Sequence, residues 1–143
     1  MVTLRRIVCL ANSRKLSERC IAGKELTGNT VGTWVRPVSA RQHGEVSKHE
    51  RQYKDGSDPQ VLDIISVSLL DPQPTDFQQE NWLLNPDCCW EKVGRATWSD
   101  LTQLVDRVEP LWIDGIRTYN GLNDTIPLSQ AGQIRSSLRL LHV

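Results

Sequence analysis

Apolar and polar residues in the first half of the chain alternate in three runs that are typical of β-strands. The most regular run is 61–70, where Val61, Ile65, Val67 and Leu69 share one face of an extended chain, interrupted by Asp63. Two more strands are predicted at 3–11 and 33–38. The first is expected to stop at the polar run 12–15, and the second at Pro37, which has no backbone N–H to donate to a sheet.

Two short helices are predicted from start signals and from spacing. Ser47 and Glu50 are three residues apart, the spacing at which each side chain can bond the other's backbone N–H, so a helix is expected over 48–54. A second, one-sided helix is predicted over 97–105, where apolar residues recur at helical intervals behind a Ser or Thr cap.

Turn-forming residues punctuate the rest of the chain. Two glycines and an asparagine mark a turn at 27–32, and Asp114–Gly115 predicts a tight hairpin within 111–119 because this dipeptide readily takes positive φ angles. Asn120–Gly121 offers a second such turn. The end of the chain, 136–143, alternates well enough for a closing strand.

Many short strands, few short helices and turn-rich connections predict a mainly β protein built as a small closed or partly open barrel. A length of 143 residues allows one ordinary core or two small barrels that share an interface. The segment Asp71–Pro74 contains two prolines and is the best candidate for an internal boundary. It would separate a basic lobe, 1–70, from an acidic lobe, 75–143, within one compact unit.

The net charge of zero hides an uneven distribution along the chain. Residues 1–54 contain 11 Lys and Arg against 4 Glu, a net charge of +7, so residues 55–143 carry −7. A basic segment attracts polyanions whatever the distant charge, which points to nucleic acid or a nucleotide as the partner. Alternatively, the two segments neutralise each other inside the molecule.

Several classes of protein and site are disfavoured by the sequence. The N-terminal segment has too few consecutive apolar residues and too many charges for a signal peptide or a membrane span. A cytoplasmic protein without membrane contact is therefore expected. No two of the four cysteines have the two-residue gap of a zinc site, so reduced buried thiols are expected, with no metal and no cofactor. No nucleotide-loop, nucleophile-elbow or metalloprotease motif is present, which argues against catalysis.

Three strings in the basic half place cations beside small or amide residues at the ends of apolar runs. The candidate ligand-binding residues are Asn12, Ser13, Arg14, Lys15, Lys24, Trp34, Arg36 and Arg41. Arg14 and Lys15 would neutralise phosphate, while Arg36 and Arg41 would form paired hydrogen bonds with phosphate or a base edge. Trp34 would stack on a base.

The same residues also have a plain structural interpretation. Cations at strand ends are usually solvated surface, and Trp34 can simply fill the core. Arg36 can pair with an acidic residue of the second half, which would make the charge division an intramolecular attraction.

A second polar cluster follows an aromatic residue near the end of the chain. Tyr119, Asn123 and Asp124 could line a pocket that reads hydrogen-bonding edges. Such residues also commonly build the turn itself, because Asn and Asp satisfy their own backbone there.

Four ordered strings resemble the bacterial family described as a dual OB-fold-containing domain. They are Ile7 to Lys15 with its Asn-Ser-Arg-Lys ending, Cys20 to Lys24, Trp34 to Arg41 with Gly44 and Glu45, and Pro110 to Ile113 with Tyr119 to Asp124. The resemblance spans nearly the whole chain and implies two small OB-like barrels packed together. By analogy it also implies recognition of nucleic acid or a nucleotide, in a defence system against invading DNA.

Three functions are therefore weighed. The leading hypothesis is a binding or sensing module for nucleic acid or a nucleotide, without catalysis of its own. The second is a small enzyme acting on nucleotides or nucleic-acid ends, with Asp124 and a Lys or Arg of the basic half as the reactive pair. The third is a subunit that docks a protein partner through its acidic half or forms a homo-oligomer.

Overall fold

Six strands form one continuous sheet in the computed structural model of the chain, which describes residues 1–27, 30–107, 117–119, 121–122, 126–131, 134 and 137–142. The strands are β1 (Thr3–Lys15), β2 (Glu18–Thr27), β3 (Thr30–Val38), β4 (Asp63–Pro72), β5 (Asn81–Leu84) and β6 (Glu91–Arg95). The predictions of three strands at 3–11, 33–38 and 61–70 are confirmed, with different ends.

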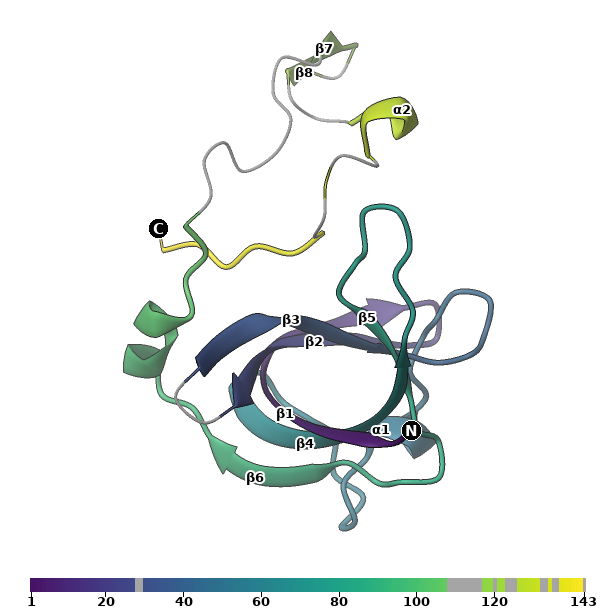
Figure 1. The fold of residues 1–143 in the computed structure, drawn as a ribbon, viewed down its shortest axis with the longest axis vertical. Coiled ribbons are helices and arrows are strands. Elements are labelled where there is room, and N and C mark those ends of the chain that lie inside the picture. The colour runs from purple at the N-terminus through teal and green to yellow at the C-terminus, as the bar shows by residue number, and fades with distance from the viewer. Residues whose placement is uncertain are drawn as a thin grey trace.

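The sheet closes into a barrel in the order β1-β2-β3-β5-β4, and β4 pairs with β1 to complete the ring (Figure 1). β3 and β5 run parallel, and the other pairs are antiparallel. A short helix, α1 (Lys48–Arg51), lies in the connection from β3 to β4. A closed five-stranded barrel of this order is the OB architecture, so the predicted mainly β, OB-like fold is confirmed.

The barrel has one core inside its ring and a second on its outer wall. Alternate residues of the strands, among them Ile7, Ile21, Val35 and Ile65, fill the inside and are fully buried. Outside, Val8 of β1 clusters with Leu62, just before β4, and with Ala96 and Leu104 of the segment that follows β6. Two layers of burial explain why β1 and β4 carry apolar residues on both of their faces.

The start of α1 is set by the capping box that its sequence predicts. Ser47 accepts a hydrogen bond from the Glu50 N–H at 3.3 Å, and Glu50 accepts one from the Ser47 N–H at 2.8 Å. The helix is shorter than the predicted 48–54, because Gln52 is already extended.

Replacing Ser47 with alanine is expected to lower the free energy of unfolding by about 1 kcal/mol, because the Glu50 N–H at the helix start loses its acceptor. Urea denaturation measures the change. Ser13→Ala, at an exposed position of β1, is the control. Equal stability of the two variants would contradict a stabilising cap.

Two strands run further than predicted. β1 continues through the polar run 12–15, where Ser13 pairs with Cys20 and Lys15 with Glu18 in a hairpin ribbon with β2. The prediction that β1 stops at residue 11 is therefore wrong. β3 begins earlier than predicted, at Thr30, and ends at Val38 as predicted, but Pro37 lies within the strand and does not end it.

The predicted helix over 97–105 is a 3₁₀ helix, η1 (Trp98–Gln103), with Thr97 as its cap residue. Asp100 Oδ2 accepts hydrogen bonds from the Thr97 N–H at 2.8 Å and from Thr97 Oγ1 at 2.9 Å, and the Asp100 N–H donates to the Thr97 carbonyl at 3.1 Å. Only Leu101 and, just beyond the helix, Leu104 pack onto the outer apolar cluster, whereas Trp98 is exposed. The segment therefore contacts the outside of the barrel through these two leucines.

Beyond residue 116, the described residues form three short elements, β7 (Arg117–Thr118), β8 (Gly121–Leu122) and α2 (Leu128–Ala131). β7 pairs with β8 across the second predicted turn, and Figure 1 places this ribbon apart from the barrel. The hairpin predicted within 111–119 falls largely on 108–116, outside the described residues. The predicted closing strand at 136–143 is wrong for the residues described there, since 137–142 form no strand.

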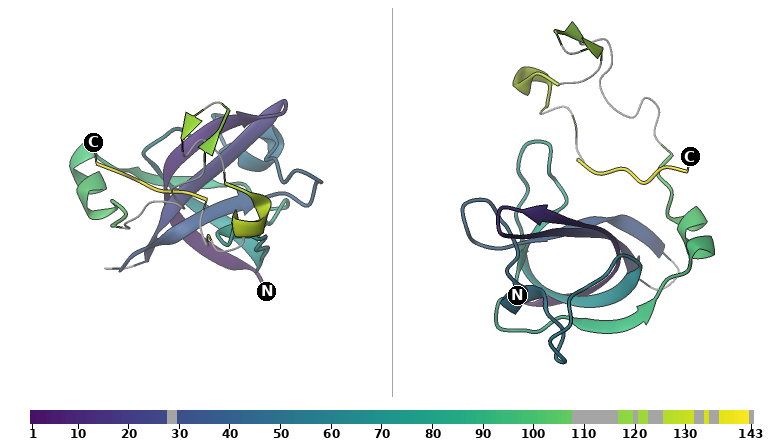
Figure 2. Two further views of the ribbon diagram at one scale, coloured as in Figure 1. Left: turned by 90° about the horizontal axis from the view of Figure 1, so that it is seen from above. Right: turned by 180° about the vertical axis from the view of Figure 1, so that it is seen from behind.

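The stretch 137–142 instead crosses the outside of the barrel, as both views in Figure 2 show. Asp106 and Leu140 bond each other twice, since the Asp106 N–H donates to the Leu140 carbonyl at 2.8 Å and the Leu140 N–H to Asp106 Oδ2 at 2.8 Å. This pairing fastens the end of the chain to the segment after η1.

The sheet crosses the boundary predicted at Asp71–Pro74. β4 runs through Pro72, and β5 and β6, which follow the boundary, pair with β3 and β4. The division into lobes 1–70 and 75–143 stays a prediction. Among the described helices, none is long and apolar enough to cross a membrane.

Candidate functional site

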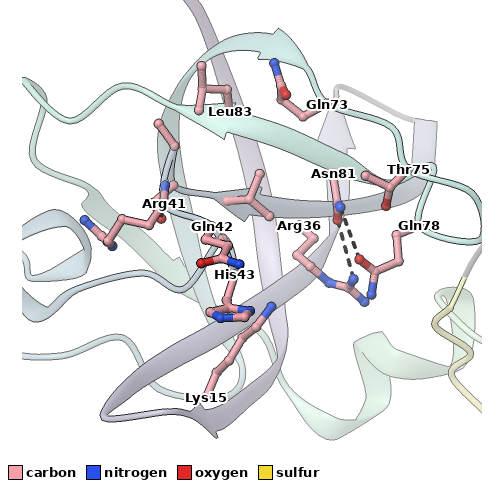
Figure 3. A pocket seen from close by; sticks show the side chains of 14 residues that line it. Lys15, Arg36, Arg41, Gln42, His43, Gln73, Thr75, Gln78, Asn81 and Leu83 are labelled. Carbon is pink, nitrogen blue, oxygen red and sulfur yellow. Dashed lines mark hydrogen bonds between the residues drawn. The ribbon is translucent and has the colours of Figure 1, made fainter.

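A polar cleft of about 390 Å³ opens where the end of β1, the β3–α1 connection and the β4–β5 loop meet (Figure 3). We call it the rim cleft. Its lining residues are Lys15, Arg36, Val38, Ser39, Ala40, Arg41, Gln42, His43, Gly44, Gln73, Thr75, Gln78, Asn81 and Leu83. The connections between β1 and β2 and between β4 and β5 are the loops that flank the ligand face of OB barrels in general.

Lys15 and His43 are the cleft's available cationic and imidazole groups. Lys15 is the last residue of β1, and His43 belongs to the β3–α1 connection. In Figure 3 the Lys15 and His43 side chains extend toward each other from their two segments. Neither side chain has a hydrogen bond or ion pair with another described residue. Both can therefore meet a ligand without breaking an internal contact.

Neutral amides supply most of the cleft's remaining polar surface. Asn81, at the start of β5, accepts from Arg36 at 3.4 Å and donates to Gln78 Oε1 at 3.3 Å, as the dashed lines in Figure 3 show. Gln42 and Gln73 are exposed, and their side-chain amides make no hydrogen bond within the described part of the chain. An amide can both donate and accept, which is what a base edge requires.

Arg36 forms the floor of the cleft and is held by an acidic residue of the second half. Its guanidinium is 3.0 Å from Glu80 Oε1 and donates to Ser137 Oγ at 2.6 Å. The alternative weighed from the sequence, an ion pair between Arg36 and the acidic half, is therefore present. The residue is 7% exposed and its charge is compensated by Glu80, so it forms a fixed, ion-paired floor beneath the cleft.

Arg41 lines the cleft with its backbone and stem while its guanidinium points away from Arg36 and Asn81 (Figure 3). It is paired with Glu45 at 3.2 Å and with the Glu50 carboxylate. The side chain remains 44% exposed, so the pair is a solvent-facing one.

Lys24 and Trp34 lie outside the rim cleft, on the face of β2 and β3 that the end of the chain covers. Lys24 donates to Asp106 at 2.6 Å and to the Leu104 carbonyl at 2.5 Å, and Trp34 Nε1 donates to Asp106 at 3.0 Å. Burial alone would raise the pKa of Asp106. The hydrogen bonds from Lys24, the Leu140 N–H and Trp34 outweigh burial and lower the pKa below its ordinary value.

The other residues of the first string have local roles. Asn12 donates to the Pro59 carbonyl at 2.8 Å and so ties β1 to the segment before β4. Ser13 and Arg14 are exposed on the β1–β2 ribbon beside Lys15, where Arg14 Nε donates to the Leu16 carbonyl at 3.1 Å. The structure thus brings Lys15, Arg36 and Arg41 to one cleft and leaves Arg14 at its margin.

The second predicted cluster is not gathered by the described residues. Tyr119 is fully exposed in the turn between β7 and β8, apart from the barrel. Asn123 and Asp124 lie outside the described residues, so the predicted pocket and the reactive pair that includes Asp124 stay predictions.

The sequence prediction missed the amide-bearing half of the cleft. Gln73 lies in the segment interpreted only as a boundary because of its prolines, and Thr75 and Gln78 follow it in a stretch to which no site was assigned. The available signal was its run of amides directly after a long strand, at a place where a loop of a barrel meets the rim.

The described residues hold no group of three or more His, Cys, Asp or Glu side chains placed to bind a metal ion. All four cysteines are free thiols, and Cys9 is buried. Burial raises the pKa of Cys9 to about 12, which keeps that thiol protonated. Cys88 and Cys89 are exposed, so the expectation of buried thiols is wrong for these two.

A closed ring in the OB order, with its cleft between the two rim loops, agrees with the comparison with known families. A family model described as a dual OB-containing domain (DuOB) matches residues 5–143. The chain belongs to the DuOB family. Neither the curated proteins nor the solved structures that were searched include a significant match to this DuOB chain.

Proposed function

We propose that this DuOB chain binds single-stranded nucleic acid, or a nucleotide, in the rim cleft. The observation that supports this proposal most directly is that Lys15 and His43 line one cleft of an OB barrel, near its β1–β2 and β4–β5 connections. The side-chain amides of Gln42 and Gln73 in the same cleft make no hydrogen bond within the described part of the chain. A volume of about 390 Å³ suits one nucleotide-sized unit at a time.

The polar groups of the cleft favour an unpaired strand over a duplex. Lys15 supplies a point charge for phosphate, while Gln42 and Gln73 offer donors and acceptors for base edges. Watson–Crick edges are accessible to side chains only in unpaired bases.

Catalysis forms no part of this proposal, and a cytoplasmic location and a role in bacterial defence remain expectations attached to it. Docking of a protein partner through the acidic half also remains a prediction.

Lys15→Glu is expected to weaken binding of a short single-stranded oligonucleotide about tenfold, because a phosphate contact becomes a repulsion. The slope of log affinity against log salt should fall by about 0.7 for the lost contact. Fluorescence anisotropy over a salt series measures both quantities.

The matched control is Lys54→Glu, which makes the same charge change at an exposed lysine that lines a different pocket. It should alter affinity far less than Lys15→Glu. If both variants lose affinity equally, or if the unaltered chain binds no oligonucleotide at low salt, the rim cleft is not the binding site.

A further inference from the structure

A second hollow opens directly beside the rim cleft, and its lining is mainly apolar. It has a volume of about 350 Å³, close to that of the rim cleft, and we call it the leucine hollow. Most of its wall is formed by Leu70, Leu83, Leu84 and Pro86. These residues belong to the end of β4, to β5 and to the turn that follows β5.

The leucine hollow and the rim cleft are continuous. Ala40, Arg41 and Leu83 line both of them. In Figure 3, Arg41 and Leu83 lie on the side of the rim cleft away from Asn81 and Thr75. A strand that places one unit in the rim cleft therefore brings the neighbouring unit to the leucine hollow.

The wall of the leucine hollow offers apolar surface that a ligand can reach. Leu70 and Leu83 are half-buried and Pro86 is exposed, whereas Leu84 is only 2% exposed. Neither Leu70 nor Leu83 is part of the two described core clusters. Covering their outer surfaces with an apolar group of a ligand is favourable, because it removes that surface from water.

The leucine hollow has no unpaired charge to attract a phosphate. The charged groups at its edge, Arg41 and Glu50, are paired with each other. Among the described residues that line the hollow none is aromatic, so a base held there is not selected by the strength of its stacking. What this lining can recognise is an apolar substituent on the base.

Thymine is the DNA base with such a substituent, its C5-methyl group, which apolar side chains contact in protein–DNA complexes. We propose that the leucine hollow is a thymine subsite, in which Leu70 and Leu83 pack against the methyl group of a base whose neighbour in the strand occupies the rim cleft. The subsite rests on the proposed binding of nucleic acid in the rim cleft, and it specifies the ligand as single-stranded DNA that contains thymine.

Two short strands of equal length, one of deoxythymidine and one of deoxyuridine, test the proposal. They have the same sugars and phosphates and differ only in the methyl group, so a difference in affinity reports the base alone. The deoxythymidine strand should bind about fourfold more tightly, as expected for the burial of one methyl group. Fluorescence anisotropy with the full chain measures both affinities.

Three variants locate the source of this preference. Leu70→Thr should bring the ratio of the two affinities close to one, and threonine is a residue that suits a strand. The matched control is Leu4→Thr, the same change at a 71% exposed position of β1 that lines neither hollow, and it should keep the fourfold ratio. Lys15→Glu should weaken binding of both strands alike and also keep the ratio.

The outcomes separate the thymine subsite from the rim cleft. Equal affinities for the two strands, with Lys15→Glu still weakening both, would overturn the subsite and leave the rim cleft as a binding site. Binding of neither strand would overturn both proposals. A preference for deoxythymidine that survives Leu70→Thr, or that Leu4→Thr removes to the same extent, would show that the leucine hollow is not its source.

Discussion

Gly23→Ala is expected to prevent the barrel from closing between β1 and β2. A Cβ at Gly23 would lie 2.1 Å from the Val8 carbonyl oxygen and 2.8 Å from its carbon, both backbone atoms. Gly23 pairs with Cys9 at the centre of this ladder, so the strands must separate to make room. A loss of about 4 kcal/mol or more in unfolding free energy is expected, measured by urea denaturation.

Gly94→Ala is the matched control for Gly23→Ala. It is also a strand glycine, but its nearest neighbour would be a side-chain methyl of Ile64 at 3.5 Å, an ordinary contact. This variant should stay within about 1 kcal/mol of the unaltered chain. Equal urea midpoints for the two variants would contradict the close approach of β1 and β2.

Asp106→Asn is expected to release the end of the chain from the barrel. The substitution leaves Lys24, which is 5% exposed, without its counter-charge. Removing one partner of a buried pair costs about 3 kcal/mol, the lower end of the usual range because Asp106 keeps 18% of its side-chain exposure. Hydrogen exchange of the Leu140 N–H, which donates to Asp106, should accelerate in the variant.

The effect of Asp106→Asn should depend on pH. Because the pKa of Asp106 is lowered in the folded chain, its carboxylate stabilises the fold above the ordinary Asp value of about 3.8. That stabilisation is lost as pH falls through the lowered pKa, so the difference between variant and unaltered chain should shrink in acid. Asp87→Asn, an exposed carboxylate, serves as control. Unchanged exchange at Leu140 would show that Asp106 does not fasten the segment.

β2, β5 and β6 were not predicted from the sequence, but β1, β3 and β4 were predictable because their inward positions are apolar and their turns carry turn residues. The ends were not, because β1 leaves the core at Asn12 and continues as a ribbon whose polar residues are stabilised by pairing with β2. Pro37 can lie inside β3 because the neighbouring Arg36 supplies the backbone donor toward β5. The Arg36 N–H donates to the Glu80 carbonyl at 2.9 Å. Alternation of side chains reports burial and says nothing about such backbone pairing.

Part of the candidate site was predictable and part was not. Lys15 and Arg36 were identified from cations at strand ends, but sequence could not show that Arg36 is paired and Lys15 is free. That distinction depends on where Glu80 falls after the chain closes into a barrel. The charge division proves to hold the molecule together in part, since Lys24–Asp106 and Arg36–Glu80 join its basic and acidic halves.

The central claim is that the rim cleft is the ligand site, and amide NMR shifts during titration with a short single-stranded oligonucleotide test it most directly. The largest shifts are expected at Lys15, Gln42, His43 and Gln73, with little change around Tyr53 and Trp90 at the other pocket. Shifts confined to that other pocket, or no shift anywhere on the barrel, would contradict the claim.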